Sequence, residues 1–242
     1  MSLFITLILG LFFLIGILVV KFYKNSEAIE HYSIAVALGA MLGIGLLDIF
    51  PEIMETVSPD KWYLPVIGAF IGFFVLILLD HFIPEHEDEH EDDYSADNMV
   101  HIGMIASVAI MIHNIIEGMA VYSLAAQDVN AGIMLMIGIG LHNIPMGMFI
   151  YSTLRSKTGW KKNMFLAMSI LSTFVGGLIM LCLEPYITAS FDGLLYGIAL
   201  GMIAYIVVME LWPYIRKHPG KVTSIVCSIL GLIVVLISVF ME

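Results

Sequence analysis

Two short segments of the sequence carry side chains that can bind a metal ion. One reads HNIIEGMA from His113 and the other HNIPMGMF from His142, so the pattern His-Asn-x-x-x-Gly occurs twice, 29 residues apart. On a helix, positions i, i+3 and i+4 share one face, so each segment presents one cluster of side chains. Imidazole, amide, carboxylate and thioether groups bind metals, and imidazole with carboxylate suits zinc, iron and manganese. The candidate ligands are His113, Asn114, Glu117, His142, Asn143 and Met146.

A structural explanation of the same residues has to be weighed. Asn and His side chains hydrogen-bond across helix bundles in membranes, which stabilises them modestly. One histidine would fit that explanation, whereas two histidines, two asparagines and a glutamate at matched positions favour a metal site. Pro145 frees a backbone carbonyl and can bend its helix, which would either open the ligand geometry or serve only as a packing kink.

The elements that position these segments are membrane-spanning helices. Apolar residues make up 60% of the 242 residues and charged residues only 13%, which excludes a soluble globular domain of this size. Apolar runs close to the ~20 residues that a spanning helix needs recur along the chain. They cover residues 3–20, 33–50, 62–82, 100–125, 131–154, 163–186, 191–212 and 222–241. The sequence predicts an all-α membrane protein, a single eight-helix transmembrane domain over 1–242, whose first run is a retained span rather than a signal peptide.

The metal-binding segments lie in the fourth and fifth spans. A short turn at 127–130 joins these spans, so we expect an antiparallel hairpin. At about 1.5 Å per residue, both clusters fall roughly 15 to 20 Å from the turn, near the membrane midplane. Ionisable groups at that depth are costly and normally face a wet cavity or the protein interior, so they predict a functional site. His101, at the start of the fourth span, is expected at the membrane interface.

Basic residues predict the topology, because they favour the cytoplasmic ends of spans. With eight spans, only Lys61 lies opposite to the others, so both termini are expected outside. The remaining basic residues are Lys21, Lys24, Arg155, Lys157, Lys161, Lys162, Arg216, Lys217 and Lys221.

An internal repeat relates the second and seventh spans. Each has a glycine, an acid nine positions later and a proline three positions after that; the residues are Gly39, Asp48 and Pro51, and Gly201, Glu210 and Pro213. The predicted topology makes the two spans antiparallel, and inverted repeats of this kind are typical of transporters. The alternative is a chance similarity between two glycine-rich apolar helices. Asp48, Glu52 and Glu210 are candidates for an ion pathway, although a solvated position at the span ends would also explain them.

An acidic loop at 84–98 follows the third span and is expected in the cytoplasm. The segment from Asp80 to Asn98 contains His81, His86 and His90 among nine acids, a composition that forbids a packed core. The loop is either a solvated linker or a weak metal-collecting segment, and the density of imidazole and carboxylate groups favours the second reading.

Taken together, the chain resembles the ZIP family of divalent metal transporters, close to its bacterial zinc uptake permeases. Eight spans, the His-containing loop after the third span and the HN motifs carry the resemblance. It implies a three-plus-two-plus-three bundle with inverted repeats, and an elevator-like or rocking movement of one part against the other. It also implies a two-metal centre, with one ion on His113, Glu117 and His142, and the other on Asn114, Glu117 and Asn143.

Two positions depart from the family pattern. Met146 stands where such families have a glutamate, and a frequent glutamate of the sixth span has Thr173 as its nearest match. Their absence removes two negative charges from a site that must offset one or two dications. We therefore expect one metal on His113, Glu117 and His142, with Met146 as a soft ligand that shifts preference or speeds release.

The expected function is passive or weakly coupled movement of Zn²⁺ or Fe²⁺, with Mn²⁺ and Cd²⁺ as further cargo, into the cytoplasm through the cell membrane. The metal is then a transported substrate and not a cofactor, and the protein is not an enzyme. No nucleotide-binding signature is present. The partners expected are divalent metal ions and the lipid bilayer, with a homodimer as one open assembly and no nucleic acid. An intramembrane metalloenzyme, although HEXXH is absent, and a metal sensor with little transport are the alternatives.

Overall fold

A computed structural model describes residues 1–23, 26–82, 96–155, 159–183, 189–217 and 220–241, and the elements in these ranges are all helical. Their bounds are α1 Ser2–Phe22, α2 Ser26–Gly43, η1 Ile44–Ile49, α3 Phe50–Thr56, η2 Pro59–Lys61, α4 Tyr63–Phe82, α5 Ala96–Gln127, α6 Val129–Thr153, α7 Trp160–Leu183, α8 Ala189–Tyr205, η4 Ile206–Leu211, α9 Trp212–Lys217 and α10 Lys221–Val239.

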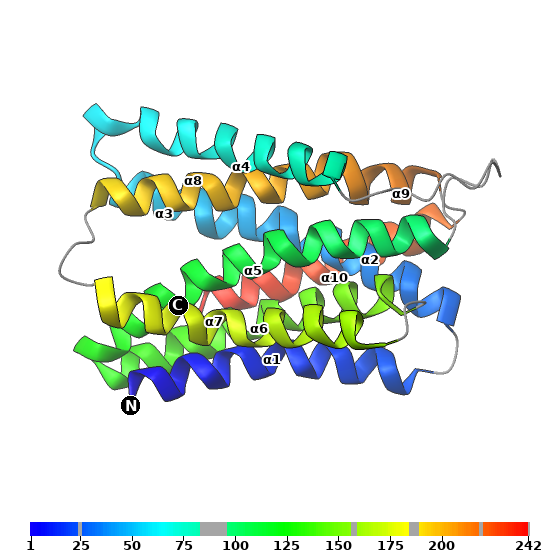
Figure 1. The fold of residues 1–242 in the computed structure, drawn as a ribbon, viewed down its shortest axis with the longest axis horizontal. Coiled ribbons are helices and arrows are strands. Elements are labelled where there is room, and N and C mark those ends of the chain that lie inside the picture. Colours follow the sequence, from blue (N-terminus) through cyan, green and yellow to red (C-terminus); the bar gives the residue numbers. More distant parts are fainter. Residues whose placement is uncertain (24–25, 83–95, 156–158, 184–188, 218–219, 242) are drawn as a thin grey trace.

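Eight of these helical segments are long and apolar enough to cross a membrane, which confirms the predicted spans. The second span is the continuous run of α2, η1 and α3, and the seventh is the run of α8, η4 and α9. Both chain termini lie at one end of the bundle, and α4 ends and α5 begins at the opposite end (Figure 1). The expected hairpin is present as well. Asp128 caps α6 by accepting hydrogen bonds from the backbone N–H groups of Asn130 and Ala131 at 2.8 and 3.3 Å.

The second and seventh spans carry the same local distortion. The π-helical turns η1 and η4 contain Asp48 and Glu210, and Pro51 and Pro213 follow within two residues of each turn. Proline has no N–H to donate to the preceding turn, so the backbone pairing must change there, and a wider turn is one way to change it. The two spans also run in opposite directions (Figure 1). The sequence repeat is therefore matched by a repeat in backbone conformation, a π-helical turn in each span.

The repeat glycines have matched roles in packing. A Cβ atom at Gly39 would run into the backbone of Ser228 on α10, and one at Gly201 would run into the backbone of Ala69 on α4. Both positions thus allow a helix to approach its neighbour to backbone contact. These parallel contacts argue against chance similarity between the two spans.

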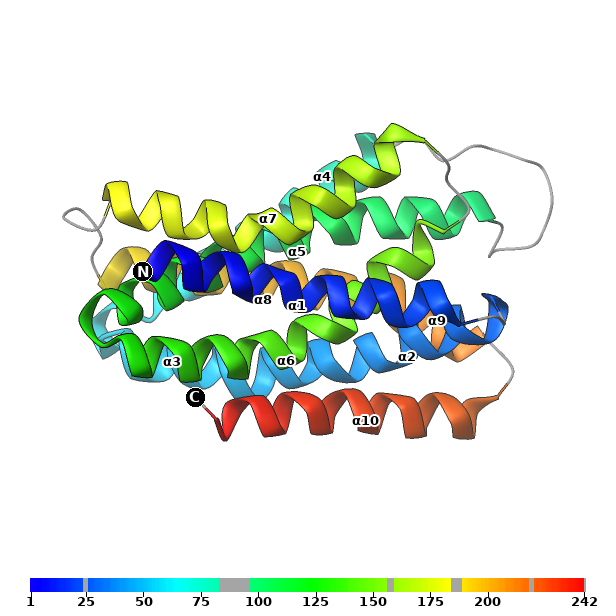
Figure 2. The same ribbon diagram turned by 90° about the horizontal axis from the view of Figure 1, so that it is seen from below.

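The helices pack in two groups, seen from two sides in Figures 1 and 2. In the first group α1 packs on α6 and α5 packs on α7, and these pairs also contact each other; in the second group α4 packs on α8 and α2 packs on α10. The first three spans correspond in order to the last three, and α5 corresponds to α6. Under this correspondence the α1–α6 pair becomes the α7–α5 pair, and the α4–α8 pair becomes the α10–α2 pair. This agrees with the expected order of two three-span repeats around a central pair.

Both glycines of the HN segments lie at close helix crossings. A Cβ atom at Gly118 would meet the backbone of Thr173 on α7, and one at Gly147 would meet the backbone of Phe13 on α1. The first group is therefore held together directly beside the candidate metal ligands.

Replacing Gly147 by alanine is expected to lower the free energy of unfolding by about 1–3 kcal/mol, because the added methyl group forces α1 and α6 apart. Thermal unfolding in detergent would measure this. Gly45→Ala is the matched control, since its added Cβ would meet only the tip of Leu200 at 3.4 Å. Equal melting temperatures for the two variants would contradict the role assigned to this crossing.

Candidate metal centre

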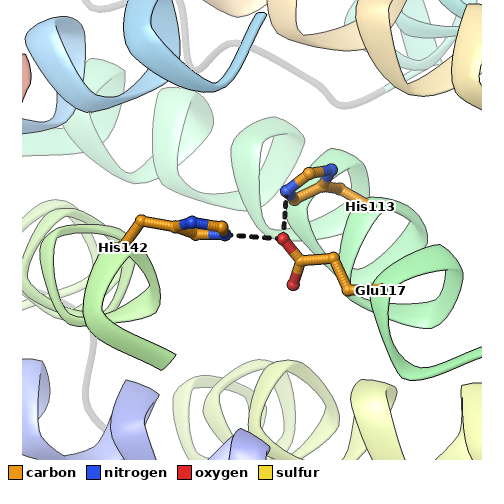
Figure 3. A group of neighbouring side chains, drawn as sticks. All are labelled: His113, Glu117 and His142. Carbon is orange, nitrogen blue, oxygen red and sulfur yellow. Dashed lines mark hydrogen bonds and ion pairs between the residues drawn. The ribbon is translucent and has the colours of Figure 1, made fainter. Parts of the chain in front are cut away.

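Three side chains from α5 and α6 converge on one point (Figure 3). His113 and Glu117 are one helical turn apart on α5, with 2.7 Å between His113 Nε2 and Glu117 Oε1. His142 on α6 places its Nε2 2.7 Å from the same oxygen. The ligand atoms of the three residues all lie within 4.8 Å of one another, and the described part of the chain contains no second such group of His, Cys, Asp or Glu.

The three side chains are buried, with exposed fractions of 6% for His113, 7% for Glu117 and 0% for His142. A tetrahedral zinc ion bound at about 2.0–2.2 Å would hold neighbouring N and O ligand atoms about 3.3 Å apart. The two observed separations of 2.7 Å would therefore need to open by about 0.6 Å. The donor set and its geometry fit a divalent transition metal.

The two asparagines of the HN segments are also buried. Asn114 Nδ2 donates a hydrogen bond to the backbone carbonyl of Ser169 on α7 at 3.2 Å. Its Oδ1, both amide atoms of Asn143 and Glu117 Oε2 have no hydrogen-bond partner among the described residues. Buried polar atoms without a partner are costly, so this cluster is suited to a cation or its hydration water.

The positions that depart from the family pattern add no carboxylate. Met146 is buried and belongs to the main hydrophobic core. The Thr173 hydroxyl donates to the backbone carbonyl of Thr6 on α1 at 3.0 Å, so it joins two helices. The Thr173 side chain therefore contributes to helix packing.

A cavity extends from the end of the bundle that holds the termini to two of the three candidate ligands, His113 and Glu117. Its inner part, of ≈ 120 Å³, is lined by Asp48, Glu52, His113 and Glu117 among others. An adjoining part, of ≈ 330 Å³, shares Glu52 and reaches Gln127 at the end of α5. The sequence placed Asp48 and Glu52 only near a span end, and the structure brings both to the cavity wall.

Tyr196 on α8 was not anticipated from the sequence. Its hydroxyl donates to Glu52 Oε1 at 3.4 Å, and the Thr56 hydroxyl donates to the same oxygen at 3.2 Å. Tyr196 lines both parts of the cavity. No sequence signal distinguishes it from an ordinary packing tyrosine, because the contact depends on how α3 and α8 meet.

Glu210 occupies a different place from its repeat partner. It lies near Tyr205, which is also within reach of Asp80. Asp80 in turn lies 2.7 Å from Nε2 of His101. The side chain of His101, which was expected at the membrane interface, is buried between helices and paired with this carboxylate, and its depth in the membrane stays a prediction.

The predicted metal-binding loop is only partly visible. His81 is exposed near the end of α4. His86, His90 and the loop through residue 95 lie outside the described residues, so a metal-collecting role for this segment stays a prediction.

Comparisons with known proteins agree with this arrangement. A family model described as ZIP zinc transporter matches residues 83–239. The zinc transporter ZupT of Lysinibacillus sphaericus is 31% identical, over 97% of this chain and 94% of the relative. The proteins of the same name from Streptococcus mutans and Corynebacterium glutamicum are 28% and 30% identical, each over 98% of this chain and over 96% and 97% of their own lengths.

Proposed function

This chain belongs to the ZIP family of zinc transporters, and from that membership we propose that it carries divalent transition-metal cations, Zn²⁺ foremost, across the cell membrane into the cytoplasm. The observation that carries the proposal is the convergence of His113, Glu117 and His142, of which His113 and Glu117 line the inner part of a cavity. The metal is the transported substrate. Fe²⁺, Mn²⁺ and Cd²⁺ use the same ligand types and are further candidate cargo.

The cavity wall supports a path for the ion. Glu52, held by Tyr196 and Thr56, would attract a hydrated cation at the wider part, and Asp48 lies between this position and the ligands. Each carboxylate replaces part of the hydration shell that the ion loses on entry. Glu210, near Tyr205, is the candidate acid of the opposite half of the path.

The orientation of the chain follows from its basic residues. Lys21, Arg155, Arg216 and Lys217 lie at helix ends on the side where α4 ends, opposite to the termini (Figure 1). We propose that this side is cytoplasmic, because positive residues accumulate there. The termini and the cavity mouth would then be extracytoplasmic, which suits uptake. The same proposal includes a single transmembrane domain over 1–242, and a homodimer as its assembly, which cross-linking in the membrane would test.

A single ion at the centre fits the charges present. Glu117 is the one carboxylate among the three converging ligands, and Asp48 on the cavity wall is a second acid close by. We propose that Asp48 offsets part of the charge of the bound dication, in the absence of acids at Met146 and Thr173.

Replacing Asp48 by asparagine is expected to raise the KM for Zn²⁺ about 10-fold or more, in line with the loss of an outer partner of a metal site. Uptake by proteoliposomes would measure it. Asp60→Asn is the control, because Asp60 is exposed in η2 away from the cavity lining. A KM unchanged in the Asp48 variant would remove this residue from the proposal.

The function itself is tested by zinc entry into proteoliposomes that contain the purified chain and a trapped zinc-sensitive dye. Saturable entry above that of empty liposomes is expected. A chain that binds Zn²⁺ in detergent but moves none would instead be a sensor or a metalloenzyme.

A further inference from the structure

Ser238, in the last turn of α10, contacts the imidazole of His142 on the side facing away from Glu117. Its Oγ lies 3.2 Å from His142 Nδ1, and both side chains are fully buried. The same hydroxyl donates a short hydrogen bond to the backbone carbonyl of Gly138, one turn before His142 on α6. Ser238 thus contacts both the ring and the helix that carries it.

This arrangement determines which ring nitrogen carries the proton. A hydroxyl has one hydrogen, and here the hydrogen is directed to the Gly138 carbonyl. The Ser238 oxygen can then only accept from the imidazole, so Nδ1 must be the protonated nitrogen. In the neutral ring Nε2 therefore carries the lone pair.

The lone pair on Nε2 faces Glu117. Nε2 lies 2.7 Å from Oε1 of that carboxylate, so two electron-rich atoms point at one location. A metal ion bound to both atoms satisfies them together, and in its absence a proton on Nε2 does so through the hydrogen bond to the carboxylate. A histidine ligand usually donates its other N–H to a carbonyl, carboxylate or water, which fixes ring orientation and tautomer. The Ser238 hydroxyl supplies that acceptor here.

We propose that Ser238 is a positioning residue of the metal centre, which holds His142 in the tautomer and orientation that present Nε2 to the ion. The inference rests on the proposed function, since it assigns a task toward the same metal. It adds α10 to the helices that shape the site, although α10 supplies none of the three ligands. Nothing in the sequence around Ser238 indicates this role.

A purely structural role for Ser238 predicts different results. Ser228 on the same helix donates to the carbonyl of Ala35 on α2 at 2.9 Å, and among the described residues no hydrogen bond joins it to an imidazole. It is therefore the matched control for a serine that only joins helices. If Ser238 only joined helices, both Ser238→Ala and Ser228→Ala would lower the melting temperature and leave the zinc affinity unchanged.

The experiment measures zinc affinity and ring tautomer in the full chain. Ser238→Ala, Ser238→Cys, Ser238→Thr and Ser228→Ala are compared with the wild type in detergent, by zinc competition with a chelating dye and by ¹⁵N NMR of labelled histidine. The His142 signal is assigned by its loss in His142→Ala. Cysteine keeps the size of the side chain but is a poor hydrogen-bonding partner, so it serves if the alanine variant does not fold.

We expect Ser238→Ala and Ser238→Cys to weaken zinc binding by about 10- to 100-fold and to show His142 as a mixture of tautomers. Ser238→Thr should keep the single tautomer and most of the affinity, and Ser228→Ala should keep both. Unchanged affinity and tautomer in both hydroxyl-deleted variants would overturn the inference. The tautomer of the neutral His142 ring, recorded at alkaline pH in the metal-free wild type, tests Ser238 even if the chain moves no zinc, whereas absent wild-type flux counts against the proposed function alone.

Discussion

Replacing Glu117 by glutamine is expected to reduce zinc uptake at least about 100-fold. One carboxylate oxygen of Glu117 lies 2.7 Å from the Nε2 atoms of both histidines, so the substitution removes the only negative charge among the three ligands. Removing one partner of a buried charge cluster costs about 3–5 kcal/mol, and about 3 kcal/mol corresponds to 100-fold in affinity. Uptake by proteoliposomes over a range of zinc concentrations measures the loss.

The control for this variant is Glu55→Gln. Glu55 is an exposed acid on α3 and lines neither part of the cavity. Normal uptake is expected from it. Normal uptake by Glu117→Gln at low zinc concentration would show that the ion takes a route that avoids the three converging ligands.

Replacing Met146 by glutamate is expected to change the number of metals that the centre holds from one to two. Met146 is one helical turn beyond His142 on α6 and is buried. A carboxylate there would add the charge and oxygen ligands that a second dication needs. Zinc per chain after equilibrium dialysis gives the number directly. Stronger binding should also slow release, so maximal uptake should fall as affinity rises.

Met146→Gln separates charge from shape in this experiment. Glutamine has the same length as glutamate but no charge, so one metal per chain is expected. Two metals of similar affinity in the wild type would show that the centre does not need the missing acid. One metal in the glutamate variant would show that position 146 does not face the ion.

The spans and the convergence of the three candidate ligands could be predicted from the sequence, because both depend on local pattern. Apolar runs report helices that cross a membrane, and the spacing of His113 and Glu117 places them on one helix face whatever the rest of the fold does. The short turn before α6 was enough to bring His142 beside them. The positions of Asp48 and Glu52 in the second span were harder to predict, because their distance from the candidate ligands depends on how η1 packs against α5.

Contacts between spans far apart in the sequence could not be predicted. Ser238 and His142 are separated by 96 residues and Tyr196 and Glu52 by 144, and nothing near any of these residues marks its partner. His101 was assigned to the interface by its place at the start of an apolar run. The hydropathy pattern does not show that α4 supplies Asp80 as a partner for the buried side chain of His101.

The division of the helices into two groups has a consequence for the release of the ion. All three ligands belong to the first group, on α5 and α6, whereas Ser238 belongs to the second, on α10. If one group slides against the other by about 2 Å, Ser238 Oγ and His142 Nδ1 pass beyond hydrogen-bonding distance. The His142 imidazole is then free to rotate, and it binds the cation more weakly. Departure of the ion would follow the sliding step, so a loaded centre would stay loaded until the protein had changed shape.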